Sequence, residues 1–182
     1  MKLSPEPSLR SAPTLETDRL VLRRFEAADF DAHHAIMIEP EVHRHLGPPF
    51  SREDLWRRTI GGVGMWTVLG FGGWMVVRKS DGTLIGNTGF FDARRDLVPD
   101  FGGAPEMGWI FAPSVHGQGL AREACQAALD WADSNLQPTP IWAIINPDNG
   151  PSFNLAERLG FDRLDDSVYN GEPIAVLRRA PR

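Results

Sequence analysis

Cysteine and tyrosine are nearly absent from this sequence, which has one residue of each, Cys125 and Tyr169. A single cysteine excludes an internal disulfide and the paired-cysteine metal sites. No apolar run reaches the ~20 residues of a membrane-spanning helix, and the N-terminal stretch has no apolar core of signal-peptide length. The net charge of −5 excludes a global basic field for nucleic acid or an anionic membrane. We therefore expect a cytoplasmic protein that has neither nucleic acid nor a membrane as a partner.

Linkers and internal repeats are also lacking, so the 182 residues are expected to form one domain. Apolar residues make up 42% of the chain, and a domain of this length buries roughly 70% of its unfolded surface without disulfides or a structural metal. Residues 1–14 differ, because they are rich in proline and serine and show no apolar periodicity. The sequence predicts a flexible N-terminal arm over 1–14 and a single domain over 15–182.

Strand and helix patterns follow one another along this domain in the order β-α-α-β-β-β-α-β-α-β-β. The segments are a strand within 15–25, helices over 29–38 and 51–70, a hairpin over 72–92, a strand over 106–111, a helix over 118–134, a strand over 140–146, a helix over 152–160 and a hairpin over 161–179. Gly61, Gly62 and Gly64 argue against a helix in the second half of 51–70. Residues 39–50 are expected to be irregular.

The stretch SVHGQGLAREA, residues 114–124, places two glycines directly before the predicted long helix. Unpaired N–H groups and the helix dipole at such an entrance attract phosphate. Gly117 and Gly119 allow a positive φ and a close approach of an anion, and Arg122 adds a full charge. A plain glycine turn before an ordinary helix fits the same residues. A Walker loop is excluded because no Gly-Lys-Ser/Thr ending is present, and a dinucleotide fingerprint is excluded because Arg122 stands where its third glycine is needed.

Three segments in order carry a resemblance to a known family. They are LETDRLVLRRFEAADFDA at 15–32, HGQGLAREA at 116–124 and NGPSFNLAERLGF at 149–161. Together they resemble the GNAT superfamily of N-acetyltransferases, and specifically the RimJ/RimL-type branch that includes ribosomal-protein N-terminal acetyltransferases. The resemblance runs from about Leu15 to Arg179. It implies an α/β (α+β) fold with a mixed, mostly antiparallel central sheet flanked by helices, and it implies acetyl-CoA as the co-substrate.

The same resemblance implies a set of coenzyme-binding residues. The backbone of the strand would pair with the pantetheine arm, the loop amides would hold the pyrophosphate, Asn149 would hydrogen-bond a pantetheine amide, and Arg158 would reach the nucleotide end. The residues concerned are Trp109, Ile110, Phe111, His116, Gly117, Gln118, Gly119, Leu120, Ala121, Arg122, Asn149, Ser152 and Arg158. The chain departs from the family at His116, where glutamine or arginine is frequent. For Asn149 and Arg158, a turn residue and an exposed helix arginine remain the alternatives.

Acetyl transfer to an amine needs a base for the ammonium proton and an acid for the departing thiolate. Glu106 opens the strand that would contact the thioester and is the predicted base. The alternatives are an edge-strand carboxylate in solvent, with Asp92 as the reserve base. Many relatives use a tyrosine as the acid, but this chain has Ala156 there. Ser152, one turn earlier, is the predicted donor to the sulfur, although a helix N-terminal cap fits it equally well, and Tyr169 on the final hairpin is expected to pack or line the substrate site.

Other chemistry-bearing side chains receive less weight. Four histidines, His33, His34, His43 and His45, with Glu41 lie in the early part of the chain, but the adjacent pair diverges on a helix and prolines interrupt the rest, so we expect no metal site. The aromatics Phe50, Trp56 and Trp66 either shape acceptor choice or belong to the core. Cys125 sits among alanines on a helix, where an acyl-carrying role is not expected.

The leading function is therefore acetyl-CoA-dependent N-acetylation of a primary amine, with a protein or peptide N-terminal amine as the acceptor. The alternatives are a small amine such as an antibiotic, a polyamine or an amino acid, and a non-catalytic acyl-CoA-binding module. No metal is expected, and the protein is expected to be a monomer or a homodimer.

Overall fold

The computed structural model describes residues 11–182, which form one eight-stranded sheet and five α-helices. The strands are β1 (Leu15–Glu16), β2 (Leu20–Arg23), β3 (Gly73–Arg78), β4 (Leu84–Phe91), β5 (Glu106–Phe111), β6 (Ile141–Ile145), β7 (Asp162–Tyr169) and β8 (Glu172–Arg179). The helices are α1 (Phe30–Met37), α2 (Pro40–His43), α3 (Arg52–Leu69), α4 (Leu120–Asn135) and α5 (Gly150–Arg158), with short 3-10 helices η1 (Ala27–Asp29) and η2 (Pro113–Val115). The predicted order is confirmed, with β1, α2 and the 3-10 turns as additions.

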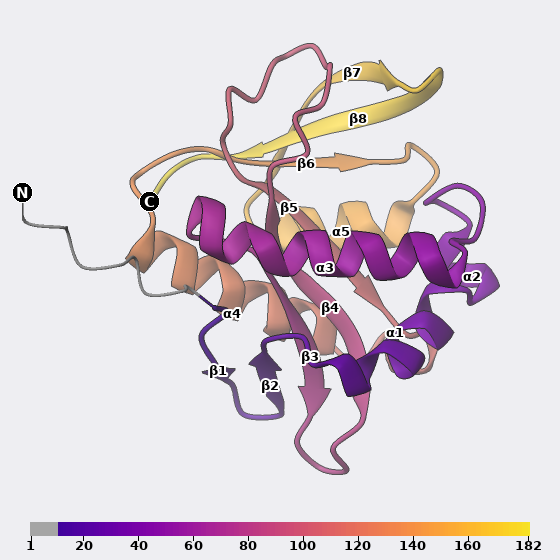
Figure 1. Cartoon of the computed structure of the whole chain (residues 1–182). Helices are drawn as coiled ribbons and strands as arrows, with labels where there is room; N and C mark the ends of the chain where they lie inside the picture. Colours follow the sequence, from indigo (N-terminus) through magenta and orange to yellow (C-terminus); the bar gives the residue numbers. More distant parts are fainter. Residues whose placement is uncertain (1–10) are drawn as a thin grey trace, which may run out of the picture.

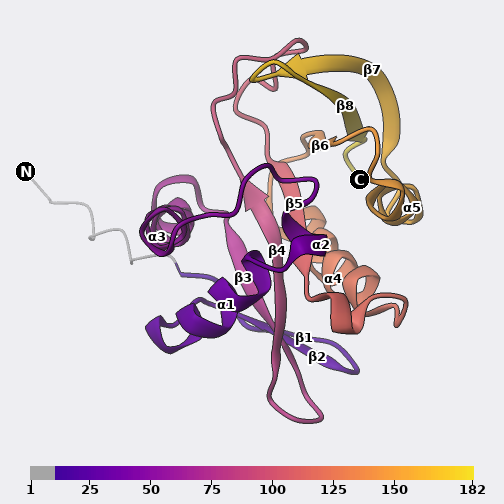
Figure 2. The same cartoon turned by 90° about the vertical axis from the view of Figure 1, so that its right-hand side faces the viewer.

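The sheet is mixed and mostly antiparallel, as expected. Its strand order is β1-β2-β3-β4-β5-β6-β8-β7, and the pairing of β5 with β6 is parallel. Helices cover both faces: Figure 2 shows α4 and α5 on one side of the sheet and α1 and α3 on the other, and in Figure 1 α3 crosses in front of the strands. Among the residues that the structure describes, no helix combines the length and apolar character needed to span a membrane.

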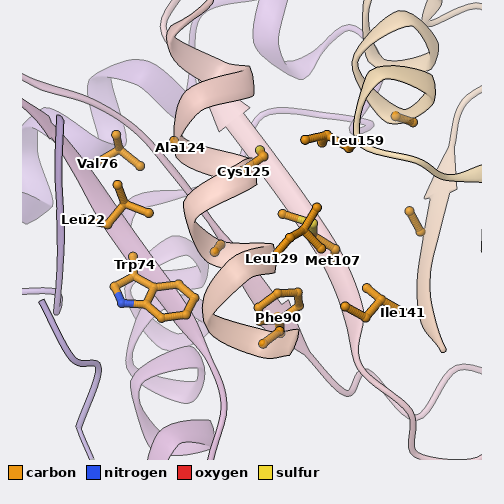
Figure 3. Close-up of a cluster of buried hydrophobic side chains, with 14 of the residues drawn as sticks. Leu22, Trp74, Val76, Phe90, Met107, Ala124, Cys125, Leu129, Ile141 and Leu159 are labelled. Carbon is orange, nitrogen blue, oxygen red and sulfur yellow. The ribbon is translucent and has the colours of Figure 1, made fainter. Parts of the chain in front are cut away.

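The main core lies between α4 and the sheet. Small and branched side chains of α4, among them Ala124, Cys125 and Leu129, are buried, and Figure 3 shows them close to sheet residues such as Trp74 and Met107. A complete apolar stripe on α4 meets the apolar faces of the strands, which is the ordinary driving force for helix-on-sheet packing.

Trp66 belongs to this core and not to an acceptor cleft. Its ring contacts Trp74 and Trp131 edge to face, with centroid distances of 4.8 Å and 5.1 Å. The indole N–H donates to the Gly73 carbonyl at 3.0 Å, so its one polar atom is satisfied. The expectation that aromatics of this region can be core residues is therefore confirmed for Trp66.

A smaller core lies on the other wing of the sheet, beneath the connection between β4 and β5. Leu97, Trp142, Ile174 and Val176 are buried there, and Phe101 stacks on Trp142 with centroids 4.6 Å apart. The connection over residues 92–105 is thus packed onto β6 and β8. This packing fixes the loop that carries part of the candidate site.

The glycines in the second half of 51–70 do not interrupt the helix, which corrects the expectation drawn from them. Helix α3 is continuous from Arg52 to Leu69, and it begins at the Ser51 cap, whose hydroxyl accepts from the Asp54 N–H at 3.1 Å. A Cβ on Gly61, Gly62 or Gly64 would meet nothing within 4 Å, so these glycines face open space. The buried side chains of Leu55 and Trp66 anchor the helix near its two ends, and it persists although each such glycine weakens a helix interior by about 1 kcal/mol. The patch expected to be irregular also contains a helical turn, α2.

The boundary of the predicted arm also changes. Residues 1–10 of the arm lie outside the described residues. Ala12 is buried, and the carbonyl of Pro13 accepts a hydrogen bond of 2.7 Å from the Trp74 indole. Residues at the end of the predicted arm are therefore packed on the domain.

Candidate active site

The parallel strands β5 and β6 separate soon after they meet, and this gap is the centre of the candidate site. Their register contains a single pair, Glu106 with Trp142, whereas the opposite edge of β5 pairs with β4 from Glu106 to Phe111. Trp109 and Ile110 consequently present one unpaired backbone edge to the gap in the part of the chain that the structure describes. Free strand groups of this kind can pair with an extended ligand.

The glycine loop follows β5 and leads into α4. Gly117 and Gly119 both have φ of 75°, the left-handed region in which other residues are strained. The long helix begins at Leu120 and not at Gln118, and Gly119 occupies its cap position without a side-chain cap. The first amides of α4 therefore lack acceptors within the helix and point from its positive end. The local conformation that the sequence predicted for an anion-binding loop is present, and the ligand itself stays a prediction.

Arg19 braces this loop from the start of β2. Its guanidinium donates to the Gln118 carbonyl at 3.0 Å and to Glu123 in the first turn of α4 at 2.7 Å. Behind the loop, the His116 ring lies 3.1 Å from the Phe111 carbonyl at the end of β5. These contacts hold the loop in one path while His116, Gly117, Gln118 and Gly119 remain exposed. Arg122 is exposed beside them.

Asn149, and not Ser152, caps helix α5. The Asn149 Oδ1 accepts from the Ser152 N–H at 3.2 Å, so the alternative in which Ser152 is the N-terminal cap is wrong. The reason is that Gly150 and Pro151 start the helix earlier than predicted, which moves Ser152 into the first turn. The Ser152 hydroxyl instead accepts from the Trp109 indole N–H at 3.3 Å. Its own proton is therefore available to donate.

The position of the family tyrosine is closed to solvent here. Ala156 is fully buried and packs in the main core, so a side chain at that position would not reach a ligand without repacking. Arg158 is exposed in the last turn of α5. Its predicted contact with the nucleotide stays a prediction.

Glu106 is buried, with 3% of its surface exposed, and it is not a solvent-exposed edge carboxylate. That alternative is wrong because β5 is a central strand and residues 92–105 cover this part of it. Burial raises the pKa of Glu106 above its ordinary value, Arg95 opposes the rise in part, and the nearby charge of Asp92 adds to it. A carboxyl group with raised pKa at the meeting point of β5 and β6 has the character of a general base.

Arg95 was not predicted, and it is the partner of Glu106. Its Nε lies 2.7 Å from Glu106 Oε2, and its guanidinium carbon lies 4.6 Å from the ring centre of Tyr169 and 5.9 Å from that of Phe91. Asp92, the reserve base, pairs with Arg94 at 2.8 Å. The local sequence does not predict the side-chain contacts of Arg95, Trp109 or Arg19. Their partners are distant in the sequence and are brought to them only by the fold.

Glu106 and Ser152 lie on opposite faces of the sheet at the gap. Glu106 and Trp109 are three residues apart on one strand, so their side chains point to opposite faces. Trp109 packs on the main core and contacts Ser152 of α5, whereas Glu106 contacts Arg95 of the connection over 92–105. The structure thus brings the two predicted catalytic residues to one gap without direct contact between them.

The remaining candidates do not form a second site. Cys125 is buried, and burial raises the pKa of its thiol to about 12, which makes it a poor nucleophile. Within residues 11–182, no three His, Cys, Asp or Glu side chains are grouped as metal ligands would be. Trp56 is 39% exposed and contacts Phe25 and Phe30 edge to face, while Phe50 lies under Arg58.

Comparison with known proteins agrees with this geometry. The family model for the acetyltransferase (GNAT) domain matches residues 19–162. The uncharacterized N-acetyltransferase p20 of Bacillus licheniformis is 28% identical over 152 residues, which cover 82% of this chain and 83% of that protein. A solved structure from Bordetella pertussis, described as a GNAT-family acetyltransferase, is 34% identical with a TM-score of 0.83, covering 93% of this chain and 100% of that one.

A third structure bears on the fold alone. RimL, a ribosomal alpha-N-protein acetyltransferase solved in complex with coenzyme A, is 17% identical with a TM-score of 0.75 and covers 93% of this chain and 98% of its own. The family match extends over more than half of the chain and takes in the glycine loop, the β5–β6 gap and Glu106. The chain therefore belongs to the GNAT acetyltransferase family and is an N-acetyltransferase.

Proposed function

We propose that this enzyme transfers the acetyl group of acetyl-CoA to the N-terminal amine of a protein or peptide. The observation that carries the proposal is the buried carboxylate of Glu106 at the point where β5 and β6 separate. A base at that position serves an amine acceptor, because an ammonium ion must lose its proton before it can attack a carbonyl. The fold shared with RimL supports the N-terminal amine as the acceptor class.

The residues present fit the coenzyme. Both loop glycines have positive φ, a Cβ on Gly117 would meet nothing within 4 Å, and the first turn of α4 is uncapped. The amides of His116 and Gln118 already donate to the carbonyls of Pro113 and Val115, so those of Gly117 and of Gly119 to Arg122 would hold the pyrophosphate. The free edge of Trp109 to Phe111 would pair with the pantetheine arm. Asn149 would hydrogen-bond a pantetheine amide from the start of α5. When bound, acetyl-CoA supplies the acetyl group as a thioester.

Two residues of the chain then accept and donate the protons of the reaction. Glu106 accepts the proton that the acceptor ammonium must lose, and its raised pKa brings its proton affinity closer to neutral pH, where a general base works best. On the other face of the sheet, the Ser152 hydroxyl donates toward the leaving sulfur while the Trp109 indole holds its oxygen. Both groups serve one gap, so a direct transfer needs no acyl-enzyme.

A mixed acceptor panel tests the proposal. The purified protein is incubated with acetyl-CoA and four substrate sets: peptides with free N-termini, the same peptides with blocked N-termini and a lysine, polyamines, and aminoglycosides. Mass spectrometry is expected to find one acetyl group on the free N-terminal peptides alone. Glu106→Gln should keep acetyl-CoA binding and lower kcat/KM by about 10²-fold or more, with a smaller loss at high pH. Acetylation confined to polyamines or aminoglycosides would replace the acceptor class, and no turnover would leave an acyl-CoA-binding module.

A further inference from the structure

The ion pair between Arg95 and Glu106 stands where an acceptor amine has to bind, and the reading of this pair rests on the proposed function. We infer that Arg95 is a stand-in for the acceptor: in the ligand-free enzyme its guanidinium occupies the ammonium subsite formed by Glu106, Tyr169 and Phe91, and the acceptor ammonium displaces it. Three arguments support this exchange. They are the chemistry of the subsite, the single contact of Arg95 with its carboxylate and its position in a connection, and the effect of Arg95 on Glu106 as a base.

The surroundings of Arg95 are those of a site for an organic cation. A carboxylate oxygen lies 2.7 Å from its Nε, and two aromatic rings, those of Tyr169 and Phe91, have their centres 4.6 Å and 5.9 Å from its guanidinium carbon. A carboxylate combined with aromatic faces binds an alkylammonium ion by the same forces. The three elements that supply these groups, β4, β5 and β7, belong to the sheet, so the subsite does not depend on Arg95 for its shape.

Arg95 makes fewer contacts with its carboxylate than two other arginines of this fold make with theirs. Arg23 and Arg179 each make two charged contacts with one carboxylate, at 2.7 Å and 2.7 Å to Asp29 and at 2.8 Å and 2.6 Å to Asp133. Arg95 contacts one oxygen of Glu106 through one nitrogen. A paired, two-point contact is stronger and more specific than a single one.

The position of Arg95 in the chain also favours exchange. Its side chain is 18% exposed, between the 2% of Arg179 and the 27% of Arg23, but it comes from a connection, whereas Arg23 and Arg179 come from strands. It can therefore turn into solvent without leaving a strand or helix. Replacement of one cation by another also keeps the buried carboxylate compensated, whereas simple loss of Arg95 would leave a costly unpaired charge.

The base needs this exchange. While Arg95 is in place, it stabilises the ionised carboxylate and lowers the proton affinity of Glu106, and it occupies an oxygen that must face the amine. When Arg95 leaves, burial and the charge of Asp92 remain, and both raise the pKa of Glu106. Acceptor binding thus replaces a guanidinium, which keeps its proton, with an ammonium ion that can give its proton to Glu106.

Binding of n-butylammonium, a plain primary ammonium probe, tests the exchange without turnover. Calorimetry is done at a mildly alkaline pH at which Glu106 is ionised and butylamine is still protonated, with 1-butanol as the matched neutral probe. Arg95→Gln removes the competing charge and is expected to tighten butylammonium binding by roughly 5-fold to 10-fold, because the competent state no longer shares its population with the Arg95-bound one. Glu106→Gln should abolish butylammonium binding, and the binding of 1-butanol should change in neither variant. Equal or weaker butylammonium binding by Arg95→Gln overturns the inference.

A measurement on the unsubstituted protein covers the case in which Arg95→Gln does not fold. The Nε–H resonance of Arg95 should be shifted and protected by its bond to Glu106, and saturating butylammonium should abolish that protection while butanol does not. An Arg95 resonance that is unmoved by saturating butylammonium likewise overturns the inference. Both readouts are independent of acetylation, so an inactive result in the acceptor panel would refute the proposed function and leave the exchange to be decided by binding.

Discussion

Asn149 caps α5 through one end of its side-chain amide, we predict that the other end binds the pantetheine arm, and two substitutions separate these roles. Its Oδ1 accepts from the Ser152 N–H at 3.2 Å, which caps the helix, and its Nδ2 group is left to donate to the pantetheine arm. Asn149→Asp keeps an oxygen for the cap and removes the N–H donor. Asn149→Ala removes both.

The expected magnitudes follow from these roles. Loss of a cap costs about 1 kcal/mol of folding stability, which in a chain of this size lowers Tm by about 2–4 °C, so Asn149→Ala should show this decrease. Asn149→Asp should hold or slightly raise Tm, because a carboxylate at a helix N-terminus interacts favourably with the dipole. One neutral hydrogen bond contributes about 1 kcal/mol, so both variants should bind acetyl-CoA about 5-fold more weakly.

Calorimetry with acetyl-CoA and a thermal unfolding curve decide the matter on the same preparations. If Asn149→Asp binds acetyl-CoA as tightly as the unsubstituted protein, the amide is a cap alone and its proposed contact with the coenzyme is refuted. If Asn149→Asp loses as much stability as Asn149→Ala, the capping geometry is refuted instead.

Three further substitutions test other parts of the structure. Gly119→Val should weaken acetyl-CoA binding by more than about tenfold, because both its φ of 75° and the close approach of the phosphate exclude a branched side chain. The control is Gly171→Val, at φ of 82° in the β7–β8 turn. It should strain the fold by a similar ~1–2 kcal/mol and leave acetyl-CoA binding unchanged. Ser152→Ala should lower kcat by roughly 10-fold to 100-fold, a small effect because a thiolate leaves readily, with Tm preserved; an unchanged kcat excludes Ser152 as the donor.

Asp29→Asn tests the acid limb of stability. Burial alone would raise the pKa of Asp29, but its contacts with Arg23 and the Glu26 N–H lower it below its usual value. The stabilisation is therefore present above about pH 4 and is lost as pH falls through the folded-state pKa. Asp29→Asn should cost about 2 kcal/mol at neutral pH, and its Tm should depend less on pH in the acid range. An identical acid dependence in both proteins would show that this pair does not govern acid stability.

The sequence predicts those parts of the fold that local chemistry determines. Asp81-Gly82 and Asn170-Gly171 form turns with positive φ at Gly82, Asn170 and Gly171, so both hairpins are where they were expected. Three glycines in the second half of α3 weaken a helix locally, but the burial of Trp66 is a tertiary effect that no local pattern records. The alternative in which Ser152 caps α5 is wrong for a related reason: asparagine and serine are both good caps, and the helix begins directly after the earlier of the two, Asn149.

The candidate site likewise has a part that the local sequence predicts and a part that it does not. The glycine loop is contiguous in sequence, and its φ angles follow from its residues, so it could be predicted. Arg95 lies in a stretch without periodicity, and its partners, Glu106 and Tyr169, come from two other strands. The packing of Leu97 and Phe101 onto Trp142 holds the connection that carries this arginine to Glu106. A contact of this kind depends on the assembled sheet, and no motif around residue 95 could reveal it.

The predicted acid, Ser152, and the predicted base, Glu106, lie on opposite faces of one gap, and this placement separates the directions from which the two substrates would approach. Alternation along β5 sends Glu106 toward the connection over 92–105 and Trp109 toward α5, on the opposite face. Under the proposed function, the acceptor would reach Glu106 from the face that Arg95 occupies, and the sulfur would reach Ser152 from the face that carries α5. Both substrates could then be present together, because neither route crosses the other. Cys125, the one thiol that could carry an acyl group, is buried and hydrogen-bonded to Thr88, and its pKa of about 12 keeps it protonated. Under the proposed function, transfer would therefore be direct, within a ternary complex and without an acyl-enzyme.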